Sequence, residues 1–370
     1  MIEEKPKLRY FDVVPQSKGF ILVDPFSISK EMFLSKNSFL LLTLIDGKGT
    51  ISDIKSKYLK ITGIILSDIE IINFINALDQ NFLLYNERFL ERVKKEKEKI
   101  KNENFKEIKY GNNLEELKES ISKKYFEFTK RIKGVIVPHI DLKAAITTYQ
   151  KFFSILQSIK EKIIFVFGVP HFWYELPFSI FPKNFMVGEK IVESDLALIE
   201  KISKVFDYDI TADFFAYKRE HSIEFPVLFI SFLNENKKVI TSLVSESNVK
   251  KLKEISKKIT EVLKDLKEDI FLISSIDLSH VGRKFGDEKS YDPEEVDKIY
   301  IDSILNLENE KAFELLEKNE NRTRIDGKNT NFLFLEILKE FNIKKGNLID
   351  YKKHYEELSD SIVTYALMVF

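Results

Sequence analysis

Four of the chain's five histidines stand where a predicted strand or helix ends, and their side chains are the ones best suited to chemistry. They are His139, His171, His221 and His280. Three of the four follow apolar runs rich in Val, Ile and Phe, which are typical of strands buried in a parallel sheet. In an open α/β sheet, ligands bind beyond the carboxyl ends of the strands. The pattern therefore indicates a metal site or an acid–base site at one edge of a sheet.

Two of these histidines are predicted to share an ion. His139 ends the strand predicted in GVIVPH, and His171 ends the neighbouring one in IIFVFGVPH, where Gly168 lets the backbone turn closely. One such histidine alone could simply cap a strand by bonding to backbone. Two imidazoles at adjacent strand ends can bind one metal at N–metal distances of about 2.0–2.1 Å.

The segment SSIDLSH offers an acid–base pair. Asp277 and His280 are three residues apart, so they share a face if the segment turns helical. A carboxylate can then orient the imidazole and support its protonated form. Capping of a helix by Asp277 or Ser279 is the structural alternative. His221, next to Glu220, is either a structural histidine or a proton carrier, and both interpretations stay open.

Other motifs are weaker or missing. Asp326-Gly327 is a turn signal within RTRIDGKNT, and spacing alone makes this segment a loop. His354 lies in a charged stretch and carries no functional signal. Neither a glycine-rich phosphate loop nor a GxSxG nucleophile turn is present.

Composition restricts the possible function classes. The 370 residues include 58 basic and 59 acidic side chains, so a global basic field for nucleic acid is not supported. Cysteine is missing, which leaves His, Asp and Glu as metal ligands. We find neither an apolar signal-peptide core at the start nor an uncharged run of about 18 apolar residues. We therefore expect a cytoplasmic protein that does not span a membrane.

Two domains and a linker are predicted. Residues 1–92 contain a strand in KGFILVDP, helices with Ser52 or Asp53 as a possible cap, and a final short strand pair with Asn86 near its turn. This order suggests a small α+β domain of winged-helix type. Residues 93–132 are polar at their start and are interpreted as a linker.

From residue 133 to 370 the predicted elements alternate between strands and helices. Such alternation implies an α/β domain with a mostly parallel sheet flanked by helices. The predicted strands are KGVIVPH, KIIFVFGVPH, FPVLFISFL, KKVITSLVSE, DIFLISSIDLSH, GNLIDYKKHY and SIVTYALMVF.

The ordered blocks VPHIDLKAA, FGVPHFW, EHSIEFP and SSIDLSH resemble the Memo family, whose prokaryotic members are often called AmmeMemoRadiSam system protein B. The resemblance covers roughly 134–370. It implies a fold similar to that of class III extradiol dioxygenases, which are nonheme iron enzymes. Metal binding and redox activity are associated with the family. The first 92 residues also look like PqqD-like winged-helix modules, which recognise peptides.

The resemblance also implies roles for individual residues. It places metal-site histidines at His139 and His171, and the family's Asp and His pair at Asp277 and His280. Many members carry cysteine before a later glycine, and Asp326 stands in that place here. Two histidines and a carboxylate would form a set suited to nonheme Fe(II). The PHAGY form of the first block is absent, because Ile140 follows His139.

The resulting expectation is a metal-dependent oxidoreductase of dioxygenase type. His139, His171 and Asp326 would hold a divalent metal, Fe(II) first and Zn, Mn or Cu as alternatives. His280, oriented by Asp277, would be the acid–base group, with His221 as a second donor. Two other functions remain open: a metal-dependent hydrolase, and a protein that binds a small molecule or peptide without turnover and partners a radical-SAM protein.

Overall fold

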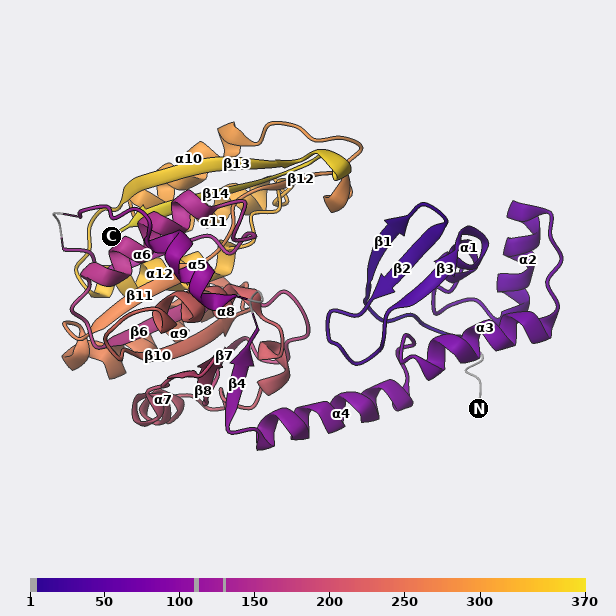
Figure 1. Ribbon diagram of the computed structural model, residues 1–370, viewed down its shortest axis with the longest axis horizontal. Coiled ribbons are helices and arrows are strands. Elements are labelled where there is room, and N and C mark those ends of the chain that lie inside the picture. The colour runs from indigo at the N-terminus through magenta and orange to yellow at the C-terminus, as the bar shows by residue number, and fades with distance from the viewer. Residues whose placement is uncertain (1–4, 110–112, 129–130) are drawn as a thin grey trace. The chain divides into compact units, whose positions relative to one another are not determined.

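The computed structural model describes residues 5–109, 113–128 and 131–370 (Figure 1). Its contacts divide the chain into two compact units, Met1–Glu103 and Asn104–Phe370. Each unit buries a hydrophobic core of its own. Within the described ranges, every helix is too short or too polar to cross a bilayer.

The first unit starts with an antiparallel sheet and continues with helices. The strands lie in the order β1 (Asp12–Gln16), β2 (Gly19–Val23) and β3 (Met32–Ser35). The helices that follow are α1 (Lys36–Thr43), α2 (Ile51–Thr62), α3 (Asp68–Gln80) and α4 (Glu87–Asn102). Apolar side chains of the sheet and of α1, α2 and α3 meet in one core that includes Leu22, Ile54, Ile71 and Leu78.

Two local predictions for this unit were wrong. Thr50, rather than Ser52 or Asp53, caps α2, and Asp53 bonds back to it to complete a capping box. Asn86 does not mark a hairpin turn: its side chain accepts from the backbone N–H of Phe89 and caps α4. The sheet thus precedes the helices and no hairpin forms at 81–103, so the winged-helix type is not confirmed.

The second unit is built on a sheet with a parallel centre. Its order in the described chain is β12-β14-β5-β11-β6-β10-β7, with β13 paired to β14. Strands β5, β11, β6 and β10 run parallel, whereas β7, β12, β13 and β14 pair antiparallel at the two edges. The bounds are β5 Gly134–Val137, β6 Ile163–Gly168, β7 Phe178–Ile180, β10 Lys238–Val244, β11 Ile270–Ser275, β12 His280–Gly282, β13 Asn347–Glu356 and β14 Ser361–Val369. The α/β class predicted from the sequence is confirmed.

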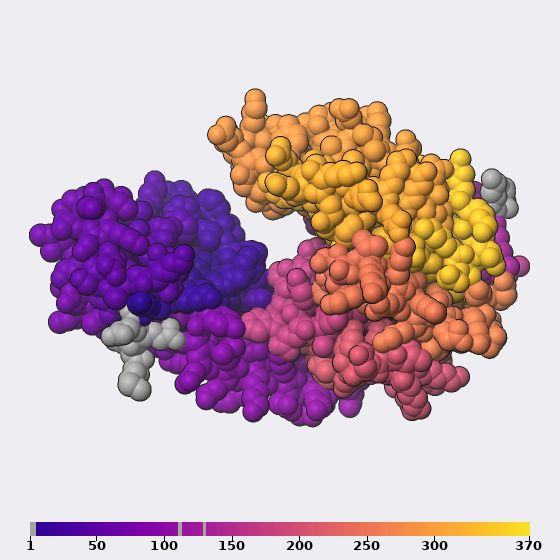
Figure 2. All heavy atoms as spheres, turned by 180° about the vertical axis from the view of Figure 1, so that it is seen from behind, coloured from indigo at the N-terminus to yellow at the C-terminus, as the bar shows by residue number. Residues whose placement is uncertain are grey.

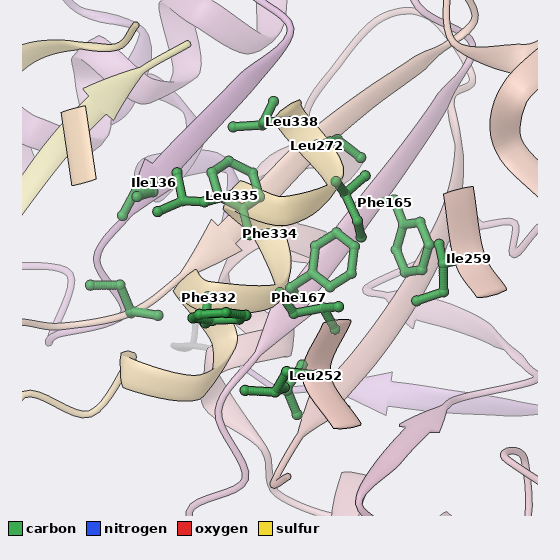
Figure 3. Close-up of a cluster of buried hydrophobic side chains, with 14 of the residues drawn as sticks. Ile136, Phe165, Phe167, Leu252, Ile259, Leu272, Phe332, Phe334, Leu335 and Leu338 are labelled. Carbon is green, nitrogen blue, oxygen red and sulfur yellow. The ribbon is translucent and has the colours of Figure 1, made fainter. Parts of the chain in front are cut away.

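Helices cover both faces of this sheet, because its central strands are apolar on both sides. Along β6, Phe165 and Phe167 face one core cluster, while Ile164 and Val166 face the other. The first cluster packs under α7 (Leu196–Ser203), α9 (Val249–Leu263), α10 (Glu294–Leu305), α11 (Asn309–Lys318) and α12 (Lys328–Glu340), and part of it is drawn in Figure 3. The second packs under α5 (Leu114–Ser122), α6 (Ile146–Ser158) and α8 (His221–Ser231). In the space-filling view, the orange-to-yellow segments from α10 onward form a continuous surface (Figure 2).

One strand prediction in this unit was wrong. All but the last two residues of the run FPVLFISFL belong to α8, which starts at His221 and contains Pro226. Phe225 to Ser231 are all buried. When every residue of a segment is apolar, the sequence shows neither the helical nor the strand periodicity, so a buried helix cannot be distinguished from a buried strand. As a result His221 starts a helix instead of preceding a strand.

Much of the predicted linker is folded. Residues 93–102 continue α4, and β4 (Phe105–Ile108) pairs with β8 (Asn184–Val187), which itself pairs with β9 (Lys190–Val192). Ile108 and Ile121 are buried in the second core cluster of the larger unit. These two apolar residues are surrounded by polar residues in the sequence, so the composition of the segment did not indicate that it packs into the second unit.

Candidate metal site

Three adjacent parallel strands deliver side chains to one edge of the sheet. His139 lies two residues after β5, Asp277 two residues after β11, and His171 three residues after β6. Strand β11 lies between β5 and β6. The carboxyl ends of these strands therefore meet, as expected for a site at the edge of an open α/β sheet.

Two glycines let further segments reach this edge. A Cβ on Gly168 would lie 2.6 Å from atoms of Ser222 and Ile223, so only glycine lets the start of α8 pack on the end of β6. A Cβ on Gly327 would lie 2.5 Å from Ile276, next to Asp277. The close approach at Gly327 brings the loop that carries Asp326 against β11.

His139 is enclosed by two carboxylates. Its backbone N–H donates to Asp277 Oδ1 at 3.0 Å. Its ring Nε2 lies 3.1 Å from Asp326 Oδ2 and 3.9 Å from Asp277 Oδ2, and Ser275 Oγ lies 3.4 Å from Nδ1. The side chain is 1% exposed, so the backbone and Ser275 fix this ring in a buried position.

His171 is held by a carboxylate that the sequence did not single out. Glu220 accepts from the backbone N–H of His171 at 2.8 Å, and its Oε1 lies 2.8 Å from the ring Nδ1. The other ring nitrogen, Nε2, lies 3.7 Å from Asp326 Oδ2. Glu220 directly precedes His221, and that position was the only signal of its role in the sequence.

Three imidazoles gather at this place. The ring centroid of His171 lies 4.2 Å from that of His221 and 4.8 Å from that of His139, and the His139–His221 distance is 4.9 Å. Two groups of side chains each bring their ligand atoms within 4.8 Å of one another. They are His139, His171 and His221, and His139, Asp277 and Asp326.

The fourth predicted histidine is oriented differently from the expectation. His280 starts β12 rather than a helix, and its Nδ1 lies 3.0 Å from the carbonyl oxygens of Leu278 and Arg324. These carbonyls, instead of Asp277, orient the ring. Neither ligand group found among the described residues contains His280. A positive charge on this ring would oppose the rise in the pKa of Asp277 and add to the lowering of the pKa of Asp326, so His280 lies near both carboxylates.

The histidine pKa values are pushed apart. Burial lowers the pKa of His171, but the charges of Glu220 and Asp326 outweigh it and raise the pKa to about 10. Burial, reinforced by the positive charges of His139 and His171, lowers the pKa of His221 to about 3. In the metal-free protein at neutral pH, His171 therefore holds a proton that the adjacent His221 ring lacks.

The pKa values of the two aspartates are also shifted in opposite directions. Burial and the nearby charge of Asp326 raise the pKa of Asp277, although His139 opposes them. Burial alone would raise the pKa of Asp326, but His139 and His171 hold it well below its usual range. Asp326 is thus the carboxylate that stays ionised, and it is the better anionic ligand.

The donor set fits a divalent metal. His139 Nε2 and Asp326 Oδ2 are both buried and 3.1 Å apart, yet among the described residues neither has a hydrogen-bond partner of acceptable geometry. Buried polar atoms are rarely left in this state. Imidazole nitrogen and carboxylate oxygen are ligands for Fe, Zn and Mn, so an ion between these atoms would satisfy both.

Comparison with known proteins identifies the family of this chain. The family model described as Memo-like protein matches residues 107–369. A MEMO1 family protein of Aquifex aeolicus is 43% identical over 99% of this chain and 100% of its own length. A MEMO1 family protein of Thermus thermophilus is 23% identical over 86% of this chain and 98% of its own. The crystal structure of an uncharacterized Escherichia coli K12 protein covers 65% of this chain and 100% of its own length, with a TM-score of 0.38 and 13% identity. No conclusion is based on a similarity of that size. The chain belongs to the Memo-like protein family.

Proposed function

We propose that this protein is a metal-dependent oxidoreductase whose divalent metal is held by His139, His171 and Asp326. The observation that supports this most is the pair His139 Nε2 and Asp326 Oδ2, which are buried, 3.1 Å apart and without hydrogen-bond partners in the part of the chain that the structure describes. The Nε2 atom of His171 lies 3.7 Å from the same oxygen. One carboxylate oxygen thus lies within 3.7 Å of two imidazole nitrogens.

Fe(II) is the first candidate for the ion. Two imidazoles with one carboxylate form the ligand set of many nonheme Fe(II) oxygenases, and Zn and Mn also accept these ligands. The chain has no cysteine, so a thiolate that would select Cu(I) is missing. A bound ion would polarise a substrate oxygen and, if it is iron, support one-electron chemistry.

Residues next to the proposed ligands would form hydrogen bonds to a substrate or hold a proton. His221 is neutral at physiological pH because its pKa is lowered to about 3, so its ring can accept a hydrogen bond from a bound group. Asp277, with its raised pKa, is suited to hold a proton beside His139. His280 lies at the start of β12, and its ring is oriented by the carbonyl oxygens of Leu278 and Arg324.

Substrate would reach the site from the side of His171 and His221. Their side chains are 23% and 33% exposed, whereas that of His139 is 1% exposed. The buried His139 would then serve only the metal. The more open histidines could also contact the substrate.

The test is metal analysis followed by an activity assay. Protein purified without chelator or histidine tag should carry close to one divalent ion per chain. Reloaded anaerobically with Fe(II) and given ascorbate as the electron donor, it should consume O₂ when O₂ is admitted. His354→Ala should behave like the wild type, because His354 lies on β13 and belongs to neither candidate ligand group. Zn-supported ester or amide cleavage without O₂ uptake would instead indicate a hydrolase. Absence of bound metal under all loading conditions would contradict the proposal and favour a ligand-binding protein, with a radical-SAM protein as a possible partner.

A further inference from the structure

Glu220 is the most completely buried carboxylate beside the metal site. It is 0% exposed and caps α8, where its Oε1 accepts from the backbone N–H of Ser222 at 3.0 Å. Two further contacts of its carboxylate go to His171, through the backbone N–H and the ring Nδ1, each at 2.8 Å. The His221 Nδ1 lies 3.8 Å from the same oxygen, Oε1. Every one of these partners belongs to the two segments that carry ligand candidates.

Ser222 strengthens the same junction. Its Oγ donates to the carbonyl of Val169 at 3.0 Å and accepts from the N–H of Val169 at 3.1 Å. The segment after β6 is therefore fixed to the start of α8 at both Val169 and His171. Gly168 has no side chain, which makes this close packing possible. Rotation of the His171 ring would break its contact with Glu220.

The orientation of the His171 ring has a chemical consequence. Because Nδ1 faces Glu220, the other nitrogen, Nε2, is directed to the side where Asp326 Oδ2 lies 3.7 Å away. A carboxylate that accepts from one imidazole nitrogen fixes the tautomer and makes the second nitrogen a stronger donor to metal. We propose that Glu220 is a positioning residue that presents His171 Nε2 to the metal and strengthens its bond to it. This inference rests on the proposed metal site.

Glu220→Gln is the informative variant. A glutamine keeps the size of the side chain but loses the charge, and its amide NH₂ would face an N–H of His171 or Ser222. Loss of a partner of this kind typically weakens metal binding about 10–100-fold. The measurement is anaerobic titration with Co²⁺ and with Zn²⁺ in competition with a chelator, which needs no substrate and no turnover.

Glu161→Gln is the matched control. Glu161 is also buried, at 5% exposed, but it pairs with Lys133 near the amino ends of β5 and β6, away from the ligand segments. Its loss removes a buried negative charge and destabilises the fold without touching the site. Metal affinity in Glu161→Gln should equal that of the wild type, which separates positioning of His171 from general loss of stability.

A second readout covers the case in which Glu220→Gln folds poorly. In the wild type, ¹⁵N-labelled imidazole spectra of the Zn²⁺-loaded protein should show His171 with its proton on Nδ1. The proposal is overturned if that proton is on Nε2, or if a folded Glu220→Gln binds metal as tightly as the wild type. A wild-type chain that binds no metal overturns the proposed function first, and the positioning role with it.

Discussion

Asp326 is the residue that most distinguishes this site, because a carboxylate stands where the resemblance led us to expect cysteine in many relatives. It is harder than a thiolate and therefore favours Fe(II), Mn and Zn over Cu(I). Asp326→Cys should keep a metal site but shift its preference toward softer ions. Competition between Zn²⁺ and Cu(I), measured on both proteins under anaerobic conditions, checks this. Equal selectivity would show that Asp326 does not contact the ion.

Individual residues of the site were partly predictable. His139 and His171 were predicted from the sequence because each follows a strongly apolar strand, and Asp277 because it stands three residues before His280; both patterns are local. Asp326 was predicted only through the resemblance. Its side chain accepts a hydrogen bond from the backbone N–H of Asp277, but the two residues are 49 positions apart in the sequence. Glu220 was not identified, because its bond to His171 spans another 49 residues and leaves no local pattern.

At the scale of elements, the junction of β6 with α8 is the most sensitive to substitution. Gly168→Ala would place a Cβ 2.6 Å from Ser222 Oγ and Ile223 Cδ1, so α8 must shift. We expect a loss of about 1–3 kcal/mol in the free energy of unfolding, as for other overpacked sites, together with weaker metal binding. Chemical denaturation and metal titration of the same variant measure the two effects.

Gly49→Ala is the control for that substitution. The nearest atom to a Cβ at Gly49 is 3.4 Å away, in the first unit, so the change should leave both stability and metal binding nearly as they are. If Gly168→Ala binds metal as the wild type does, the position of α8 does not determine the site.

The first unit contains a buried ion pair that should dominate its stability. Arg9 and Asp24 lie 2.9 Å apart with side chains 2% and 1% exposed. Arg9→Met should destabilise this unit by about 3–5 kcal/mol, because it leaves a buried carboxylate without its cation. Urea unfolding followed by circular dichroism tests this expectation, and a midpoint equal to that of the wild type would contradict it.

The same pair predicts acid sensitivity. Burial would raise the pKa of Asp24, but bonds from Arg9 and Ser29 outweigh it and lower the pKa below its ordinary value of 3.8. A carboxyl whose pKa is lower in the folded state stabilises the fold above its unfolded pKa. Its contribution is lost as the pH falls through the folded value. Unfolding of the first unit should therefore become easier below about pH 3.8, and an acid-insensitive midpoint would refute this.

Secondary structure was predictable where the pattern had a clear period. The strands before His139 and His171, and α9 with its lysine-rich outer face, agree with the sequence. The helix α8 was mistaken for a strand because Phe225 to Ser231 are buried on every side. Asn86 was placed in a hairpin because asparagine favours both turns and helix caps.

At the scale of the whole molecule, all candidate ligands and both large core clusters lie in the second unit. A fragment of residues 104–370 should therefore fold and bind metal with the affinity of the full chain. A fragment of residues 133–370, cut where the sequence pattern changes, lacks β4, α5 and the ion pair between Lys106 and Glu224. It should unfold at a lower temperature.

Thermal unfolding and metal titration of the two fragments compare these boundaries. Equal melting temperatures would show that β4 and α5 contribute little to the stability of the second unit. Residues 104–132 would then act only as a linker, as the sequence predicted. Failure of 104–370 to bind metal, when the full chain binds it, would show that the first unit is needed for the site.

The measurement that tests the central claim most directly is anaerobic calorimetric titration of Fe(II) into the wild type, His139→Ala, Asp326→Ala and His354→Ala. We predict tight binding of one ion by the wild type and by His354→Ala, and a comparable, near-complete loss in the other two, with unfolding midpoints showing that both remain folded. Unchanged affinity in Asp326→Ala, beside lost affinity in His139→Ala, would make Asp326 a turn residue and contradict the proposed ligand set.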